Sequence, residues 1–325
     1  MYIDTTKAIR TLLILLLLAL PALNLNAQDE GDMQPITLHF AATVGDEVAQ
    51  CGATYMAVGA DEAEVSFNDF RLYVTSIHLL MADGEAVPLQ LEQDGVWQVE
   101  NVALLDFEDG TAGCSEMGNA ALNGEVIGMA PAGEYVGLQF DVGVPFELNH
   151  QEVTAAASPL NIAAMWWNWQ GGYKFIRVDL MTHGDETVPW NIHLGSTGCD
   201  SPAGAVPPQD VCTRPNITTV TFDEFDFDNG VIAVDLAGML AGVPLYENTM
   251  MPPGCMSGLD DPDCPALFAG LGLSLDEGFC LDGDCSAQGL FRVSDVDTFT
   301  PVGRTSMTGA MSMGDGAGDH GGHGG

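Results

Sequence analysis

The 325-residue chain carries 46 acidic residues against 8 Lys and Arg, which gives a formal net charge of −38. A chain this acidic repels nucleic acid and anionic membranes, so neither is expected as a partner, whereas cations are tolerated or attracted. Solubility in a salty or extracellular medium explains the overall charge more simply than a specific binding role.

The first residues predict a secretory signal peptide over residues 1–27. Lys7 and Arg10 form its charged region, residues 12–20 its apolar region, and Ala27 its cleavage point. The apolar run is too short for a comfortable membrane span, and no other segment qualifies. We therefore expect a periplasmic, extracellular or cell-surface protein with no integral membrane segment after signal cleavage.

The body of the chain, residues 28–304, predicts a mainly β fold. Short runs that alternate apolar and polar residues are broken by Gly, Pro, Asn and Asp, which favours an antiparallel β-sandwich, with a barrel as the alternative. Short helices are expected only at 153–157 and 266–271. The expected strands are 36–42, 70–79, 97–99, 133–140, 174–180, 217–222 and 231–236.

The sequence changes character near residue 245. Residues 245–304 hold four of the eight Cys among loop-forming residues, and we expect a disulfide-stapled, loop-rich C-terminal appendage packed on the sandwich. Residues 305–325 are mostly Gly, Met, Asp and His, and this composition predicts a disordered tail. The Met and His residues of the tail either capture copper weakly or occur there by coincidence, and the sequence favours neither alternative.

Eight Cys in an exported chain predict disulfides. Proximity in the sequence favours Cys199–Cys212, Cys255–Cys264 and Cys280–Cys285, which leaves Cys51–Cys114, although sequence alone does not fix the pairing. Thiolate ligation of a metal is the weaker alternative, because the chain has no Cys-x-x-Cys pair and the expected compartment is oxidising.

The segment 165–175 is the most distinctive part of the chain. It holds Trp166, Trp167 and Trp169, three of the five Trp, and Lys174, the single Lys after residue 27. Packed core aromatics before a Gly-Gly turn are the simplest explanation. Adjacent Trp side chains point to opposite faces of a strand, however, and each buried indole N–H needs a partner. The cluster therefore indicates a stacking platform, a redox-active aromatic or a metal cage.

Imidazole is scarce before the tail. A lone His is more often a hydrogen-bonded core residue than a ligand, but His150 and His193 lie in sharp motifs that contain Asn or Gly. Imidazole and thioether groups suit copper, particularly Cu(I), in a compartment where Cys is held in disulfides. The His that precede the tail are His39, His78, His150, His183 and His193.

The sequence contains no recognisable enzyme motif. The pattern Gly-x-Ser-x-Gly and the phosphate-binding and dinucleotide-binding glycine patterns are absent, as is Cys-x-x-Cys-His for covalent haem. Acidic clusters such as 223–228 and 260–263 do not fit a calcium loop, and chance explains them better. We expect a metal-binding protein with no catalytic residues.

An ordered series of motifs resembles the MbnP-like family, described as the four-Cys half of a metallo-mystery pair. The eight Cys of this chain exceed the four of that description, so the matching four are not assigned. The series is specific although any single piece is weak. The pieces are 70–75, 102–107, 143–145 with 149–150, 158–161, 166–175, 193–199 and 253–258.

This resemblance implies an exported, mainly β protein that binds copper, as Cu(I) or Cu(II). It also implies a partner, a dihaem cytochrome c peroxidase-like (MbnH-like) protein, which in characterised relatives oxidises a Trp to kynurenine. The amine of kynurenine can bind copper, whereas the lone pair of an indole nitrogen belongs to the ring. The candidate metal-site residues are His150 and His193, then His39, with Met165 and either Trp166 or Trp169.

Three function classes follow. The first is copper acquisition, storage or delivery by a protein that a haem enzyme matures. The second is an extracellular module that binds carbohydrate or another ligand on the Trp cluster. A secreted hydrolase has the least support, because no nucleophile–base pair is recognisable.

Overall fold

The computed structural model describes residues 32–116, 120–168, 170–202, 206–247, 249 and 252–305. The predicted signal peptide, residues 1–27, lies outside the described residues, as does all of the predicted tail beyond residue 305. Among the described residues, no helix is both long and apolar enough to cross a membrane.

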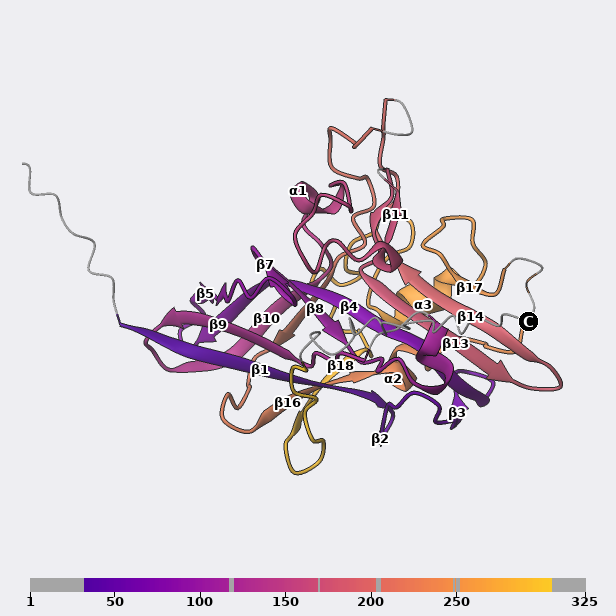
Figure 1. The fold of residues 1–325 in the computed structure, drawn as a ribbon, viewed down its shortest axis with the longest axis horizontal. Helices are drawn as coiled ribbons and strands as arrows, with labels where there is room; N and C mark the ends of the chain where they lie inside the picture. The colour runs from indigo at the N-terminus through magenta and orange to yellow at the C-terminus, as the bar shows by residue number, and fades with distance from the viewer. Residues whose placement is uncertain are drawn as a thin grey trace, which may run out of the picture.

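The strands form two large sheets and one small hairpin (Figure 1). Sheet one has the order β18-β16-β1-β9-β6, with β2 beside β1. Its β1 pairs antiparallel with β9 but parallel with β16. The strands of sheet one are β1 Met33–Val44, β2 Glu47–Val48, β6 Gln90–Leu91, β9 Glu125–Pro131, β16 Gly230–Asp235 and β18 Phe291–Asp295.

Sheet two has the order β15-β10-β4-β13-β14-β17, and β3, β5 and β8 also pair with β4 while β7 pairs with β8. The 19-residue β4 is its central strand. The strands of sheet two are β3 Tyr55–Val58, β4 Ala63–Met81, β5 Ala86–Pro88, β7 Gln98–Val99, β8 Val102–Asp106, β10 Tyr135–Val142, β13 Ile176–His183, β14 Thr187–Leu194, β15 Thr218–Phe222 and β17 Gly254–Cys255.

The two sheets share one apolar core. Leu38 and Phe40 of sheet one belong to the same buried cluster as Phe70, Leu72 and Phe140 of sheet two. The rings of Phe40 and Phe140 meet edge to face with centroids 5.8 Å apart. The predicted β-sandwich is therefore confirmed. It is not purely antiparallel, because β1–β16 and β14–β17 are parallel pairs whose members are joined by long connections.

A second apolar cluster lies on the opposite face of sheet two. Leu72 of β4 points into the shared core, so Tyr73 points the other way, where it packs with Leu104, Leu160 and Tyr173. The Tyr73 hydroxyl donates to the Pro159 carbonyl at 3.1 Å. The segment from residue 144 to 175 thus covers part of the outer face of sheet two.

This covering segment, labelled by α1 and β11, lies well away from β1 and β2 in Figure 1. It contains α1 Phe146–Asn149, the 3-10 turn η2 Ala163–Met165, and the hairpin of β11 Trp166–Asn168 and β12 Gly172–Tyr173. The remaining short helices are η1 Ala112–Glu116, α2 Leu236–Leu240 and α3 Cys264–Gly270.

The helix expected at 266–271 is present as α3, whereas the one expected at 153–157 is wrong. Ala155 and Ala156 both donate their backbone N–H to the Glu152 carbonyl, which makes a turn that does not continue. Pro159 follows closely, and the residue before a proline disfavours helical backbone.

All four disulfides have the pairing that proximity favours: Cys51–Cys114, Cys199–Cys212, Cys255–Cys264 and Cys280–Cys285. Residues beyond 245 also contribute one strand to each sheet, since β17 pairs with β14 and β18 with β16.

Candidate functional site

Five charged or ionisable side chains form a row on the outer face of sheet two. The strand register aligns them: Asp69 pairs with Asp179, Arg71 with Arg177, and Arg177 with His193. Their sequence neighbours on β4, β13 and β14 point into the shared core, so these side chains point away from it. We call these five residues the ionic row.

The ionic row is connected throughout. His193 Nε2 lies 2.7 Å from Asp179 Oδ1, and Arg177 Nη2 lies 2.5 Å from Asp179 Oδ2. Arg177 Nε lies 3.1 Å from Asp69 Oδ2, and Arg71 Nε donates to Asp69 Oδ1 at 2.8 Å. Each buried charge therefore lies beside an opposite charge, as burial of ions requires.

The carboxylate of Asp179 fixes the tautomer of His193. Burial by itself would raise the pKa of Asp179, but the hydrogen bonds from His193 and Arg177 lower it to about 2. Because the ionised carboxylate accepts a hydrogen bond, Nε2 of His193 carries the proton. In the neutral ring the lone pair is then on Nδ1, which is the atom able to bind a metal. A carboxylate that orients a metal-binding His in this way is a recurrent arrangement.

Arg177 connects the ionic row to the covering segment, and Lys174 shares its acceptor there. Lys174 Nζ donates to the Ala164 carbonyl at 2.8 Å, and Arg177 Nη1 donates to the same oxygen at 3.0 Å. Burial, reinforced by the charge of Arg177, lowers the pKa of Lys174 to about 8. Ala164 lies two residues before Trp166, so these two cations hold the start of the Trp hairpin against the row.

The Trp hairpin is built on side-chain hydrogen bonds. Asn168 Oδ1 accepts from the backbone N–H groups of Gln170 and Gly171 at 2.9 and 2.8 Å. On the return strand, Gly172 has φ of +70°, and a Cβ there would lie 2.4 Å from Asn149 Oδ1. Only glycine fits both the left-handed backbone and the close approach.

A pocket of about 550 Å³ lies between the hairpin and the residues that follow β14. The ring of Trp167 lies against Gly195, since a Cβ on Gly195 would come within 2.5 Å of it. Gln170 Nε2 donates to the Cys199 carbonyl at 2.7 Å. The pocket is lined by Trp167, Asn168, Gln170, Gly171, Ser196, Thr197, Gly198, Cys199 and Met256.

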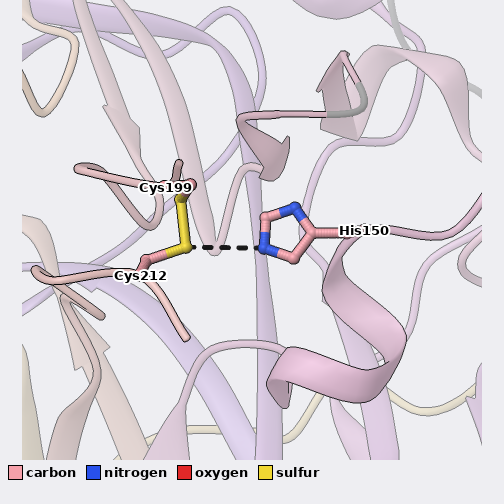
Figure 2. A group of neighbouring side chains, drawn as sticks. All are labelled: His150, Cys199 and Cys212. Atoms are coloured by element: carbon pink, nitrogen blue, oxygen red, sulfur yellow. Dashed lines mark hydrogen bonds between the residues drawn. A yellow bond between two sulfur atoms is a disulfide. The ribbon is translucent and has the colours of Figure 1, made fainter. Parts of the chain in front are cut away.

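His150 lies beside the Cys199–Cys212 disulfide (Figure 2). It follows α1 and is buried, with Nε2 3.5 Å from Cys212 Sγ. Its ring packs against Phe146 with centroids 5.1 Å apart. Asn149 Nδ2 lies 3.3 Å from the same Nε2. Asn149 also links His150 to the hairpin, because its Oδ1 accepts the Tyr173 N–H at 2.8 Å.

A family model for MbnP matches residues 33–257. The chain belongs to the MbnP family. Its fold is similar to that of MbnP from Methylosinus trichosporium, with 32% sequence identity and a TM-score of 0.69 over 81% of this chain and 99% of that chain. No curated protein sequence matches the chain. The ionic row, the Trp hairpin and His150 all lie within the part matched to MbnP.

In this MbnP-family fold, the residues predicted from sequence occupy several environments. His193 lies in the ionic row, and His150 lies at the disulfide. No group of three or more potential His, Cys, Asp or Glu ligands found among the described residues contains both. His39 belongs to sheet one, where its Nδ1 lies 3.6 Å from Glu125 Oε1, and it faces away from the shared core. The structure thus does not bring His39 to the other two imidazoles.

The predicted residues of the Trp motif also differ in burial. Met165 is fully buried in the second apolar cluster, so its thioether packs against apolar side chains. Trp166 packs at the edge of that cluster and is half-buried, with its Nε1 buried. Trp169 lies outside the described residues. Trp167, which is not among the predicted metal-site residues, lines the pocket.

Sequence reasoning missed three residues of this MbnP-family site. The sequence gives no sign of the role of Asp179. It lies two residues from Arg177 in an alternating strand, a position typical of a solvent-facing residue. Asn149 gives no signal of its own, because its neighbour His150 is the more usual type of metal ligand. Met256 lines the same pocket as Trp167, and its position in a Gly- and Cys-containing motif was the available signal.

Proposed function

We propose that this protein is an exported copper-binding member of the MbnP family that acts in copper acquisition, storage or delivery. The observation that carries the proposal is the contact of 2.7 Å between His193 and the ionised Asp179 beside the Trp hairpin. This contact presents one imidazole nitrogen for a metal and anchors the ring from behind.

The donor set of this region fits copper. His193 Nδ1 is the best-prepared ligand atom, whereas His150 lies in a different environment beside the disulfide. The thioether of Met256 lies at the pocket and is a soft ligand that suits Cu(I). A copper ion bound there would be able to bind further nitrogen or sulfur ligands. The protein's part is to fix the tautomers, hold the rings and limit access of water.

We further propose that Trp166 or Trp169 is converted to kynurenine by a dihaem peroxidase-like partner that uses peroxide. Cleavage of the indole C2–C3 bond inserts two oxygen atoms from two peroxide molecules, which leave as two water molecules. Hydrolysis then removes C2 as formate and frees an aromatic amine. The link through Ala164 holds Trp166 near the ionic row, which supports Trp166 as a source of this ligand.

Copper titration of His193→Ala, with all disulfides intact, tests the proposal. We expect the tight site to be lost, whereas Asp179→Asn lowers affinity by about 10–100-fold because it removes only the orienting carboxylate. The matched control is His183→Ala, since His183 also lies on sheet two but is bound to Ser66 at 2.9 Å. Unchanged copper stoichiometry and affinity in His193→Ala would refute this assignment.

Intact mass and peptide mapping of protein from the native host test the modification. We expect a gain of about 4 Da on one Trp of residues 166–169, the net of adding two oxygens and losing carbon monoxide. Unmodified Trp in protein made together with its genomic neighbours would contradict the kynurenine ligand.

The pocket beside Trp167 favours one alternative, a binding module for carbohydrate or another extracellular ligand. Its volume of about 550 Å³ is within the range of small-molecule sites, and the indole provides a stacking face. Glycan binding that Trp167→Ala abolishes and copper chelation does not affect would favour this function.

A further inference from the structure

In the contact between His150 and the Cys199–Cys212 disulfide, neither of the two facing atoms carries a proton. Asn149 Oδ1 accepts the Tyr173 N–H at 2.8 Å, which fixes the orientation of this amide. The NH₂ group of Asn149 therefore faces His150 Nε2 at 3.3 Å and donates to it. Nε2 is thus the ring nitrogen that carries the lone pair.

That lone pair lies beside a sulfur that has no proton. Nε2 is 3.5 Å from Cys212 Sγ, and a disulfide sulfur can only accept. In Figure 2 the imidazole edge points at the sulfur pair from the opposite side of the site. While the disulfide is intact this lone pair accepts the Asn149 N–H, and a cation bound between Nε2 and the sulfur would take the place of that donor.

The spacing matches a thiolate–imidazole metal site. Bond lengths of about 2.3 Å to sulfur and about 2.0–2.1 Å to nitrogen at a tetrahedral ion place these two ligand atoms about 3.6 Å apart. The observed separation is 3.5 Å, and the three atoms His150 Nε2, Cys199 Sγ and Cys212 Sγ all lie within 4.8 Å of one another. While the disulfide is intact its sulfurs are not thiolates, and thiolate is the form that binds metals.

We propose that the Cys199–Cys212 disulfide closes a latent Cys₂His site, which opens on reduction to bind a thiophilic cation such as Zn²⁺ or Cu⁺. A dithiol reductant would break the S–S bond, giving two protein thiols and an oxidised reductant. Binding of the cation by both sulfurs then releases two protons, and His150 Nε2 supplies the third ligand. This site goes beyond the proposed copper function, because its ligands include the two sulfurs that reduction releases, whereas the copper function rests on His193 and Asp179.

The disulfide lies between two openings. Cys199 lines the pocket of about 550 Å³, and Cys212 lines a second pocket of about 200 Å³. Both half-cystines are buried as residues, yet a small reductant and then a cation have a route to them through these pockets. The same burial protects the bound cation from bulk water.

Within the described part of the chain, the other disulfides differ in their surroundings. Cys255–Cys264 has Asp261 nearby, but the carboxylate of Asp261 accepts the N–H groups of Met256 and Asp263 at 3.1 Å each. Among the residues that the structure describes, neither Cys51–Cys114 nor Cys280–Cys285 belongs to a group of three potential ligands. Cys280–Cys285 therefore offers a matched control, because its removal also deletes one disulfide.

Zinc binding to the full chain before and after anaerobic reduction tests the proposal. The reductant is dithiothreitol, removed by gel filtration, and alkylation with mass mapping identifies which disulfides have opened. We expect protein with Cys199 and Cys212 reduced to bind one more Zn²⁺ than oxidised protein. The Cys199→Ser/Cys212→Ser variant should lose this ion, whereas Cys280→Ser/Cys285→Ser should retain it.

His150→Ala guards against a folding artefact, because this variant keeps all four disulfides while it is oxidised. After reduction we expect its zinc affinity to fall by more than about tenfold, because loss of a partner that only orients a ligand already costs about 10–100-fold and this variant loses a ligand itself. His193→Ala should lose copper binding in the oxidised state and keep the zinc of the reduced state, which separates the two proposals. Equal zinc binding by reduced wild type and Cys199→Ser/Cys212→Ser would overturn the latent site.

Discussion

Replacing Asp179 by Asn removes the carboxylate that holds His193 and Arg177, and its effect on stability depends on pH. The side chain of Asp179 is only 18% exposed. Its pKa falls from 3.8 to about 2 on folding, because the hydrogen bonds from its two partners outweigh the effect of burial. This difference of about two units between the pKa of the unfolded and of the folded state corresponds to about 2–3 kcal/mol of folding free energy.

The direction of the pH effect follows from the lowered pKa. The stabilisation is fully present above about pH 4 and is lost as the pH falls through about 2, where the folded protein also protonates Asp179. Wild type should therefore be more stable than Asp179→Asn by about 2–3 kcal/mol near neutral pH, and the difference should shrink towards zero near pH 2.

Urea unfolding with the disulfides intact, followed by Trp fluorescence and circular dichroism, measures this difference across the pH range. Asp46→Asn is the control, because Asp46 is fully exposed and lies 3.8 Å from Arg292. We expect a much smaller gap for that variant, because solvent screens an exposed ion pair. A gap for Asp179→Asn that is below about 1 kcal/mol near neutral pH, or that stays constant down to pH 2, would refute the reasoning.

Three further perturbations probe the same face of sheet two. Asp69→Ala removes the carboxylate shared by the buried guanidinium groups of Arg71 and Arg177, so urea unfolding should show a free energy of unfolding that is lower by about 3–5 kcal/mol. A decrease below about 1 kcal/mol would contradict a buried network. The rate at which Lys174 reacts with amine reagents should rise with a midpoint near pH 8, because burial lowers its pKa, and mass spectrometry of its own peptide measures that rate. A midpoint above about pH 10 would contradict this. Gly195→Ala should displace the ring of Trp167, destabilise the protein by about 1–3 kcal/mol and shift Trp fluorescence, whereas an unchanged spectrum would place the ring elsewhere.

The strands were predictable where one face is buried and the other is polar. Residues 36–42 and 174–180 alternate in this way; the first run lies in β1, and the second lies in β13 from Ile176 onward. The prediction for 70–79 was too short, because β4 begins at Ala63. The central part of β4 is buried on both faces, because the shared core lies on one side and the covering segment on the other. An alternating pattern within the strand cannot show that residues far along the chain will cover its second face.

The candidate site was predictable only in part, for a related reason. Scarcity singled out His150 and His193, and clustering singled out the Trp motif. The alternation of 36–42 places His39 on the face opposite Leu38, but nothing local assigns that strand to sheet one. The ionic row arises from the register of three strands, so its partners could not be paired from spacing alone.

The parallel pairing of β1 with β16 has a consequence for how the protein is made. β1 emerges first, while β16 lies almost two hundred residues later and must still recruit β18. Until then one edge of β1 has unsatisfied backbone groups and Phe40 lacks its cover from Phe140 and the strands beyond. Nascent chains that expose such an edge aggregate or pair with other chains. Safe biogenesis therefore depends on keeping this edge of β1 from pairing with another chain until β16 has been made.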